Sequence, residues 1–136
     1  MQPTEQLVEL IDRKHGILVQ LRDVGRRQID FVASRDTASL IKLLATKQSL
    51  IASLQSVERV LAPFAAQDPE NRVWRSSDER SRCAQQAADC NELLREIVNL
   101  EKKGIDQMTS HRDQIAEQLQ QVHSAVDVRN AYQAQR

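Results

Sequence analysis

The strongest constraint on the fold is one narrow stripe of apolar and thiol-bearing side chains, uninterrupted by proline, in the C-terminal half of the chain. Its members follow one another at spacings of three or four residues, with Glu101 and Arg112 as polar interruptions. They are Cys83, Ala87, Cys90, Leu94, Ile97, Ile105, Met108, Ile115, Leu119, Val122 and Val126. This spacing predicts one helix over about residues 77–126, which would be ~75 Å long. Nothing else in the chain predicts a helix of that length, so the other elements must pack along it.

The two ends of this helix, and one position inside it, carry recognisable signals. Ser76 and Glu79 have the spacing of a capping box at a helix start. Lys102-Lys103-Gly104 is typical of a helix C-terminus, and a break there would produce a four-helix bundle. The apolar spacing keeps its phase through Gly104, however, and no loop-forming residues follow it. We therefore predict a continuous or gently kinked helix, followed by a C-terminal tail over residues 127–136.

Two shorter helices are predicted ahead of the long one, over about residues 5–34 and 37–61. Thr4 is expected to cap the first of them. Asp36 lies in the turn between them and is expected to cap the second. Because this turn is short, the two helices should form an antiparallel hairpin.

The hairpin sequence also predicts how its helices pack. Counting outward from the turn brings Glu58 beside Lys14, so we expect an ion pair between these two side chains. The second helix is the most apolar segment and is therefore expected to lie centrally in the bundle. Gly16 and Gly25 each cost about 1 kcal/mol relative to alanine inside a helix. We interpret both glycines as marks of close approach by a neighbouring backbone.

Residues 62–76 form the connection to the long helix. Pro63 is expected to end the second helix, because the residue before a proline is pushed out of the α region. Asp68-Pro69-Glu70 has the residue order of a helix start, so we expect one short helical turn that carries Trp74. Trp74 is expected to close the open end of the bundle rather than to anchor a partner.

Composition agrees with an all-helical chain. Aromatic residues make up 3 %, charged residues make up 28 %, and glycine and proline number three each. Such a composition is typical of helical bundles and coiled coils. We therefore predict an all-α fold, in which an antiparallel hairpin packs on a long third helix, as one domain over residues 1–136.

Charge and hydropathy exclude several classes of partner. The formal net charge is zero, with 19 acidic and 19 basic residues, which argues against nucleic acid as a partner. The basic cluster Arg72, Arg75, Arg80 and Arg82 is interleaved with acids and serines, so we interpret it as a solvated helix entry. The N-terminus has no secretory pattern, and the apolar runs are far too short for membrane insertion. A cytoplasmic location is expected.

The sequence contains no motif for a metal, a cofactor or catalysis. Cys83 and Cys90 lie seven residues apart on one helix face, so ~10.5 Å separates their Cα atoms, too far for a disulfide. We expect both to be small buried core residues. His111 and His123 are twelve residues apart, which is not the spacing of a metal-binding pair on a helix.

One enzyme-like alternative is a helical phosphotransfer domain, in which an exposed histidine is phosphorylated. Such domains typically carry lysine and glycine at the third and fourth positions after that histidine. After His15 these positions are Leu18 and Val19, which are expected to be buried or half-buried. We therefore predict that the chain is not an enzyme.

The predicted helix lengths leave the far end of the long helix without a partner. The hairpin helices should be ~45 and ~38 Å long, so they reach only to about Met108 of the third helix. Ile115, Leu119, Val122 and Val126 are then left uncovered. Because burying one such side chain contributes roughly 1.5–3 kcal/mol, four exposed ones are unfavourable. This end must fold back, pair with a second copy, or bind another protein as a helix in a groove.

The hairpin resembles a known protein family. The series Asp36, Leu40, Leu44, Lys47, Leu50-Ile51, Leu54 and Glu58, which ends in Leu61-Ala62-Pro63-Phe64, is similar to the second helix of FlgN-type flagellar export chaperones. The first helix from Leu18 and Leu21 onward is similar too, as is the order of two helices, a loop and a long third helix. The resemblance covers most of the chain.

This resemblance implies a function. Such chaperones hold the helical ends of hook-associated flagellar subunits and deliver them to the type III export apparatus. The family's C-terminal helix binds the subunit, which here places partner binding on Ile115, Leu119, Val122 and Val126. Tyr132 is expected to contact the export machinery. The alternative is a structural homo-oligomeric coiled coil or adaptor, in which the same face pairs with a second copy as a homodimer.

Overall fold

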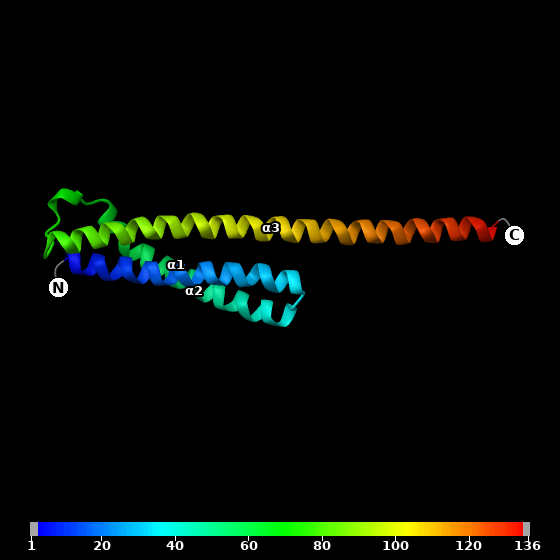
Figure 1. Cartoon of the computed structure of the whole chain (residues 1–136), viewed down its shortest axis with the longest axis horizontal. Coiled ribbons are helices and arrows are strands. Elements are labelled where there is room, and N and C mark those ends of the chain that lie inside the picture. The colour runs from blue at the N-terminus through cyan, green and yellow to red at the C-terminus, as the bar shows by residue number, and fades with distance from the viewer. Residues whose placement is uncertain (1–2, 135–136) are drawn as a thin grey trace.

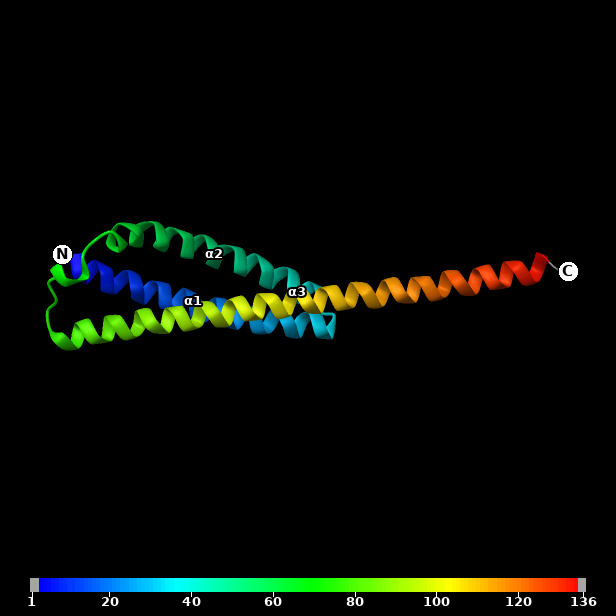
Figure 2. The same cartoon turned by 90° about the horizontal axis from the view of Figure 1, so that it is seen from above.

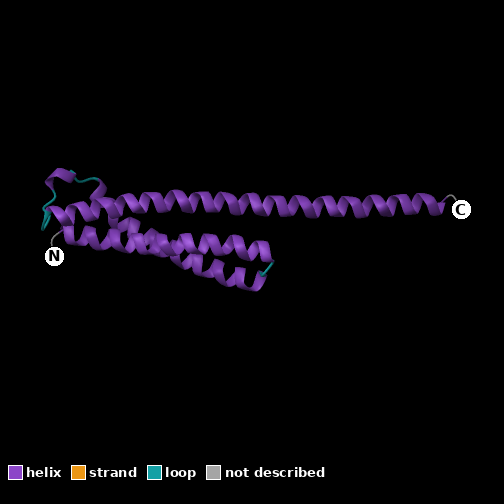
Figure 3. Cartoon of the chain, in the orientation of Figure 1, coloured by secondary structure: helices purple, strands orange, loops and turns teal. Residues whose placement is uncertain are grey.

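The computed structural model describes residues 3–134 and contains three α-helices. They are α1 (Pro3–Ser34), α2 (Thr37–Ala65) and α3 (Ser77–Ala134), and a short 3₁₀ turn, η1 (Pro69–Asn71), lies between α2 and α3. Every regular element in this part of the chain is helical (Figure 3). Helix α3 runs the length of the molecule, and the α1–α2 hairpin lies along its first part (Figure 1). The predicted all-α hairpin on a long third helix is confirmed.

Helix α1 lies between the other two helices. It packs against both α2 and α3, whereas α2 and α3 make no close backbone approach within the described residues. They lie apart near the start of α1 in Figure 2 and near the α1–α2 turn in Figure 1. The prediction that α2 lies centrally is therefore wrong. The buried leucines and valine of α1 form a stripe wide enough to pack against both α2 and α3. The apolar side chains of α2 are spread around its circumference, which leaves Ile41 and Val60 exposed.

Two apolar clusters form the core. The first joins all three helices near the start of α1 and contains Leu7, Leu10, Val57, Phe64 and Cys83, with Trp74 packed against it. The second lies further along α1 and contains Leu18, Leu21, Cys90 and Leu93. Both cysteines are free and buried, as predicted. Burial raises the pKa of both thiols, so they are poor nucleophiles at neutral pH.

The tight turn of the hairpin depends on backbone bonds and a cap. Arg35 has a φ of 59°, and the N–H groups of Arg35 and Asp36 donate to the carbonyls of Val32 and Phe31 at 3.2 and 3.0 Å. This is the Schellman arrangement that ends a helix. The Asp36 carboxylate accepts from the Ser39 N–H at 3.2 Å, which confirms the predicted cap. The hydrogen bonds to Ser39 hold the pKa of Asp36 below its usual range.

Two predicted features of the first two helices are wrong. Thr4 does not cap α1: it lies in the first turn, is buried, and its hydroxyl donates to the Val73 carbonyl at 2.6 Å. Helix α2 does not end before Pro63 but continues to Ala65. Proline lacks one N–H, yet two further residues of helix bring Phe64 into the core, where it is 8 % exposed. Burial of that ring offsets the lost hydrogen bond.

The connection and α3 also differ from expectation in places. Asp68 caps η1, as its sequence predicts, but the turn ends at Asn71 and does not carry Trp74. The Glu79 N–H donates to the Ser76 hydroxyl at 3.1 Å, as predicted for the start of α3. The helix is continuous through Gly104 and reaches Ala134 instead of ending near residue 126. Of the predicted tail, residues 127–134 are therefore helical, and residues 135–136 lie outside the described residues.

Polar side chains that interrupt the apolar stripes pair with one another. Lys14 Nζ lies 2.8 Å from Glu58 Oε1, so the predicted ion pair between α1 and α2 is confirmed. One polar layer joins all three helices: Lys47 of α2 donates to the Gln28 side chain of α1 at 3.2 Å and pairs with Glu101 of α3. Such layers favour one register, because a shifted helix would leave them unpaired.

The two glycines of α1 have different surroundings. A Cβ at Gly25 would lie 3.2 Å from the Leu100 side chain, whereas one at Gly16 would meet nothing within 4 Å. Only Gly25 therefore marks a close approach, and its neighbour is a side chain rather than a backbone. Gly104 is buried on α3 and faces the Gln28 side chain.

Candidate protein-binding face of α3

The hairpin stops well before α3 ends. Near its turn, Gln107 Nε2 donates to the Ile29 carbonyl of α1 at 3.0 Å. His111 is half-buried, and every described residue of α3 after it is exposed. The exposed part, residues 112–134, is ~35 Å long at the standard helical rise. The overhang that the helix lengths predicted is confirmed (Figure 1).

One side of α3, from Met108 into this overhang, carries an apolar strip, which we name the C-terminal seam. It consists of Met108, Ile115, Leu119, Val122 and Val126. Leu119 and Val122 are 64 % and 61 % exposed, and the other three are about half exposed. Met108, expected at the edge of the covered part, belongs to the seam. The spacings of seven, four, three and four residues are those of the contact positions in a coiled coil.

Tyr132 lies off this seam. Six residues separate it from Val126, so it is turned by roughly two-thirds of a helical turn. Val128 shares its side of the helix, and both side chains are about 70 % exposed. The structure therefore brings together four of the five predicted site residues on one face, with Met108 added. It places Tyr132 on a flanking face.

Charges around the seam are of both signs. The Arg112 guanidinium lies 3.8 Å from the Asp113 carboxylate, and His123 lies 3.5 Å from Asp127. All four side chains are exposed, so these pairs contribute little to stability. Within residues 3–134 no group of three or more His, Cys, Asp or Glu side chains is arranged to hold a metal ion. No helix in that range is long and apolar enough to cross a membrane. The chemistry of this face is that of helix–helix contact.

A second feature was missed by reasoning from the sequence: a cleft between α2 and α3, near the start of α1. Arg72 was interpreted as part of a solvated helix entry. Its side chain is instead half-buried at this cleft and donates to the Phe64 carbonyl at 2.7 Å. The available signal was the nearby pair Val73-Trp74, which follows the polar run of residues 67–72.

Comparison with known proteins gives one family. A family model described as FlgN protein matches residues 1–135, essentially the whole chain. No curated protein and no solved structure matches the chain. The three-helix fold has the element order that the resemblance of the hairpin implied. The chain belongs to the FlgN family, the chaperones of flagellar type III export.

Proposed function

We propose that this chaperone binds hook-associated flagellar subunits through the C-terminal seam of α3, and that it does so in the cytoplasm without catalysing a reaction. Family membership supplies the general role in flagellar export. The observation that carries the specific proposal is the seam itself, an apolar strip with no partner within the described residues.

The spacing of the seam indicates the kind of partner. Contact positions repeating every three or four residues match another amphipathic helix, whose side chains would fit between those of the seam. Leu119 and Val122, at the centre of the strip, have the most surface left to bury. A fully buried side chain of this size contributes roughly 1.5–3 kcal/mol. These two residues should therefore contribute most to binding.

The test is a pair of matched double variants in the full chain. Leu119→Glu with Val122→Glu places two carboxylates in the seam, and Gln120→Glu with Gln121→Glu places two on other faces of the same turn. Binding to purified hook-associated subunits is measured by calorimetry. The seam variant should lose binding by about a hundredfold or more, because a charge buried without a partner is strongly unfavourable. The control should bind normally.

Thermal unfolding keeps this test interpretable. All four positions are exposed and lie beyond the hairpin, so neither variant should change the unfolding temperature of the bundle. Equal binding by the two variants would show that the subunit binds elsewhere on the chain.

The alternative is pairing of the seam with a second copy. Light scattering across a range of protein concentrations separates the two functions. A chaperone with a free seam should have the mass of a monomer when it is alone. A tight dimer that the two seam substitutions dissociate would favour the structural coiled coil.

We further propose that Tyr132 contacts the export apparatus. Its position off the seam leaves it accessible while a subunit occupies Leu119 and Val122. Tyr132→Ala should retain subunit binding and lower subunit secretion from cells. Loss of subunit binding in this variant would instead place Tyr132 within the subunit site.

A further inference from the structure

A cleft of about 580 Å³ lies between α2 and α3, with α1 as its floor. Its walls run along α2 from Glu58 to Ala65 and along α3 from Arg80 to Asn91. The α3 wall is therefore ~16 Å long, about three helical turns. The cleft is lined by residues near the start of α1, between two helices that make no close backbone approach to each other within the described residues. With α1 packed against both neighbours and α2 and α3 apart, the cleft lies where a four-helix bundle would hold its fourth helix.

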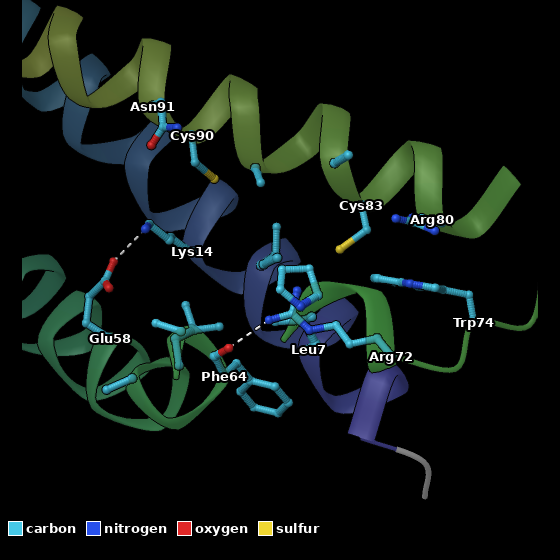
Figure 4. Close-up of a pocket in the computed structure, with 17 residues that line it drawn as sticks. Leu7, Lys14, Glu58, Phe64, Arg72, Trp74, Arg80, Cys83, Cys90 and Asn91 are labelled. Atoms are coloured by element: carbon cyan, nitrogen blue, oxygen red, sulfur yellow. Dashed lines mark hydrogen bonds and ion pairs between the residues drawn. The ribbon is translucent and has the colours of Figure 1, made fainter. Parts of the chain in front are cut away.

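The inner surface of this cleft is mainly apolar. Leu7 and Ile11 form the floor, Leu61 and Phe64 line the α2 side, and Cys83, Ala84 and Ala87 line the α3 side. The short side chains of α3 would allow another helix to approach closely. Trp74 lies across one end of the cleft, beside Arg72 (Figure 4). This surface is separate from the C-terminal seam, which lies at the other end of α3.

The charges at the cleft are unbalanced. Lys14, Arg72 and Arg80 line it together with one carboxylate, Glu58. Lys14 already pairs with Glu58 (Figure 4). Arg72 has no ion-pair partner within residues 3–134, and the only hydrogen bond of its side chain there goes to the Phe64 backbone carbonyl. Arg80 lies 3.5 Å from Glu70, with both side chains more than half exposed. The Trp74 end of the cleft therefore carries one guanidinium, that of Arg72, with no carboxylate partner among residues 3–134.

Two hydrogen-bond donors at the same end lack an acceptor. Arg72 Nε and Trp74 Nε1 are both shielded from solvent and have no hydrogen-bond partner among the described residues, 3–134. A buried donor without an acceptor costs about 1–3 kcal/mol. A ligand that brings carboxylate oxygens to this end would place acceptors beside both residues. A ligand without acceptor atoms there would leave these donors unpaired.

We propose that this cleft is a second protein-binding site, and that it takes an amphipathic partner helix with Asp or Glu beside its apolar face. The apolar face packs on the floor formed by Leu7 and Ile11, and the acidic side chains lie against Arg72 and Arg80. This goes beyond the proposed function of the seam, because the two sites lie at opposite ends of α3. One chaperone can then hold a second protein while its seam is occupied.

The test uses two synthetic helical peptides with the same leucine stripe and no tryptophan. Each has about 14 residues, enough to fill the cleft, with glutamates flanking the stripe in one peptide and lysines in the other. Trp74 is the sole tryptophan of the chain, so its fluorescence reports binding at the cleft. The acidic peptide should bind about tenfold or more tightly than the basic one. Its affinity should fall as salt concentration rises.

Three variants of the full chain locate the binding. Arg80→Gln removes one exposed charge and should weaken the acidic peptide severalfold without affecting folding. Ala87→Phe fills the cleft and should abolish binding, with thermal unfolding as the check on its fold. Leu119→Glu with Val122→Glu alters only the seam and should bind the acidic peptide normally. Subunit binding is measured in parallel, so failure at the cleft is distinguished from failure of the seam.

Two other results would overturn the proposal. Equal affinity for the two peptides would show that charge does not contribute to recognition at the cleft. Tighter binding of a peptide made from residues 112–134 of this chain would show that the cleft is filled by the protein's own helix or by a second copy.

Discussion

Replacing the same residue type inside and outside the bundle tests the division of this chain into a folded body and a free overhang. Leu18 is fully buried on α1, and Leu119 is 64 % exposed on the overhang. Leu18→Ala and Leu119→Ala remove the same atoms. Any difference between them therefore reports the surroundings of the two side chains rather than their chemistry.

The structure sets the size of the expected difference. Leu18 packs in a cluster with Leu21, Cys90 and Leu93, and side chains from α2 pack against the same cluster. Because three helices surround the site, it cannot collapse fully around an alanine. We expect Leu18→Ala to lower the free energy of unfolding by about 3 kcal/mol, within the range of 2–5 kcal/mol for buried leucines. Leu119→Ala should change it by less than about 0.5 kcal/mol.

Urea and thermal unfolding, followed by circular dichroism at two protein concentrations, measure both effects. Leu18→Ala should lower the unfolding temperature by about 10 °C, and Leu119→Ala should leave it unchanged at both concentrations. A difference of less than about 1 kcal/mol between the variants would refute the reasoning. So would a loss of stability in Leu119→Ala that depends on protein concentration, because this residue would then be buried between copies.

Three further predictions concern the hairpin. A double-mutant cycle with Lys14→Met and Glu58→Gln should give a coupling free energy of about 0.5 kcal/mol. Because Glu58 is half-exposed, this coupling should fall with added salt. A coupling of zero would show that the ion pair does not contribute to stability. Asp36→Ala should lower the unfolding temperature at pH 7, because the Ser39 N–H loses its capping acceptor. The pKa of Asp36 is lowered in the folded protein. Its stabilising contribution is therefore present above the ordinary carboxyl pKa and is lost as pH falls through the folded pKa. A difference in stability between variant and parent that persists in acid would contradict this. Gly16→Ala should stabilise α1 by about 0.4–1 kcal/mol. Gly25→Ala should stabilise it less or destabilise it, because the new Cβ would crowd a leucine of α3. Equal increases in the free energy of unfolding in urea would contradict this.

Local signals in the sequence predicted the helices well where one residue decides the outcome. Asp36 and Ser76 both accept the hydrogen bonds expected of caps, because a cap depends on a few neighbouring residues. The overhang was predictable for a similar reason: helical rise per residue is constant, so lengths follow from counting. Predictions failed where the conformational preference of a residue was outweighed by tertiary packing. Pro63 disfavours helix locally, but burial of Phe64 keeps α2 helical to Ala65.

The cleft shows a different kind of limit. Arg72 and Trp74 are close in sequence, but the walls of the cleft come from all three helices and the connection. Its existence depends on the angle between α2 and α3, and no pattern within either helix specifies that angle. The seam is the opposite case, because one amphipathic helix contains all of it and its period is visible in the sequence.

The sequence alone thus determined that the chain is helical, where most helices begin, that α3 outlasts its neighbours, and which face of the overhang is apolar. These properties follow from interactions between residues close together in the chain. Only the tertiary structure decided that α1 rather than α2 lies centrally, that Lys47 meets Glu101, and that α2 and α3 separate to leave a cleft. Those outcomes depend on how the apolar surfaces of three helices pack against one another. Such packing involves residues far apart in the sequence, so no single segment specifies it.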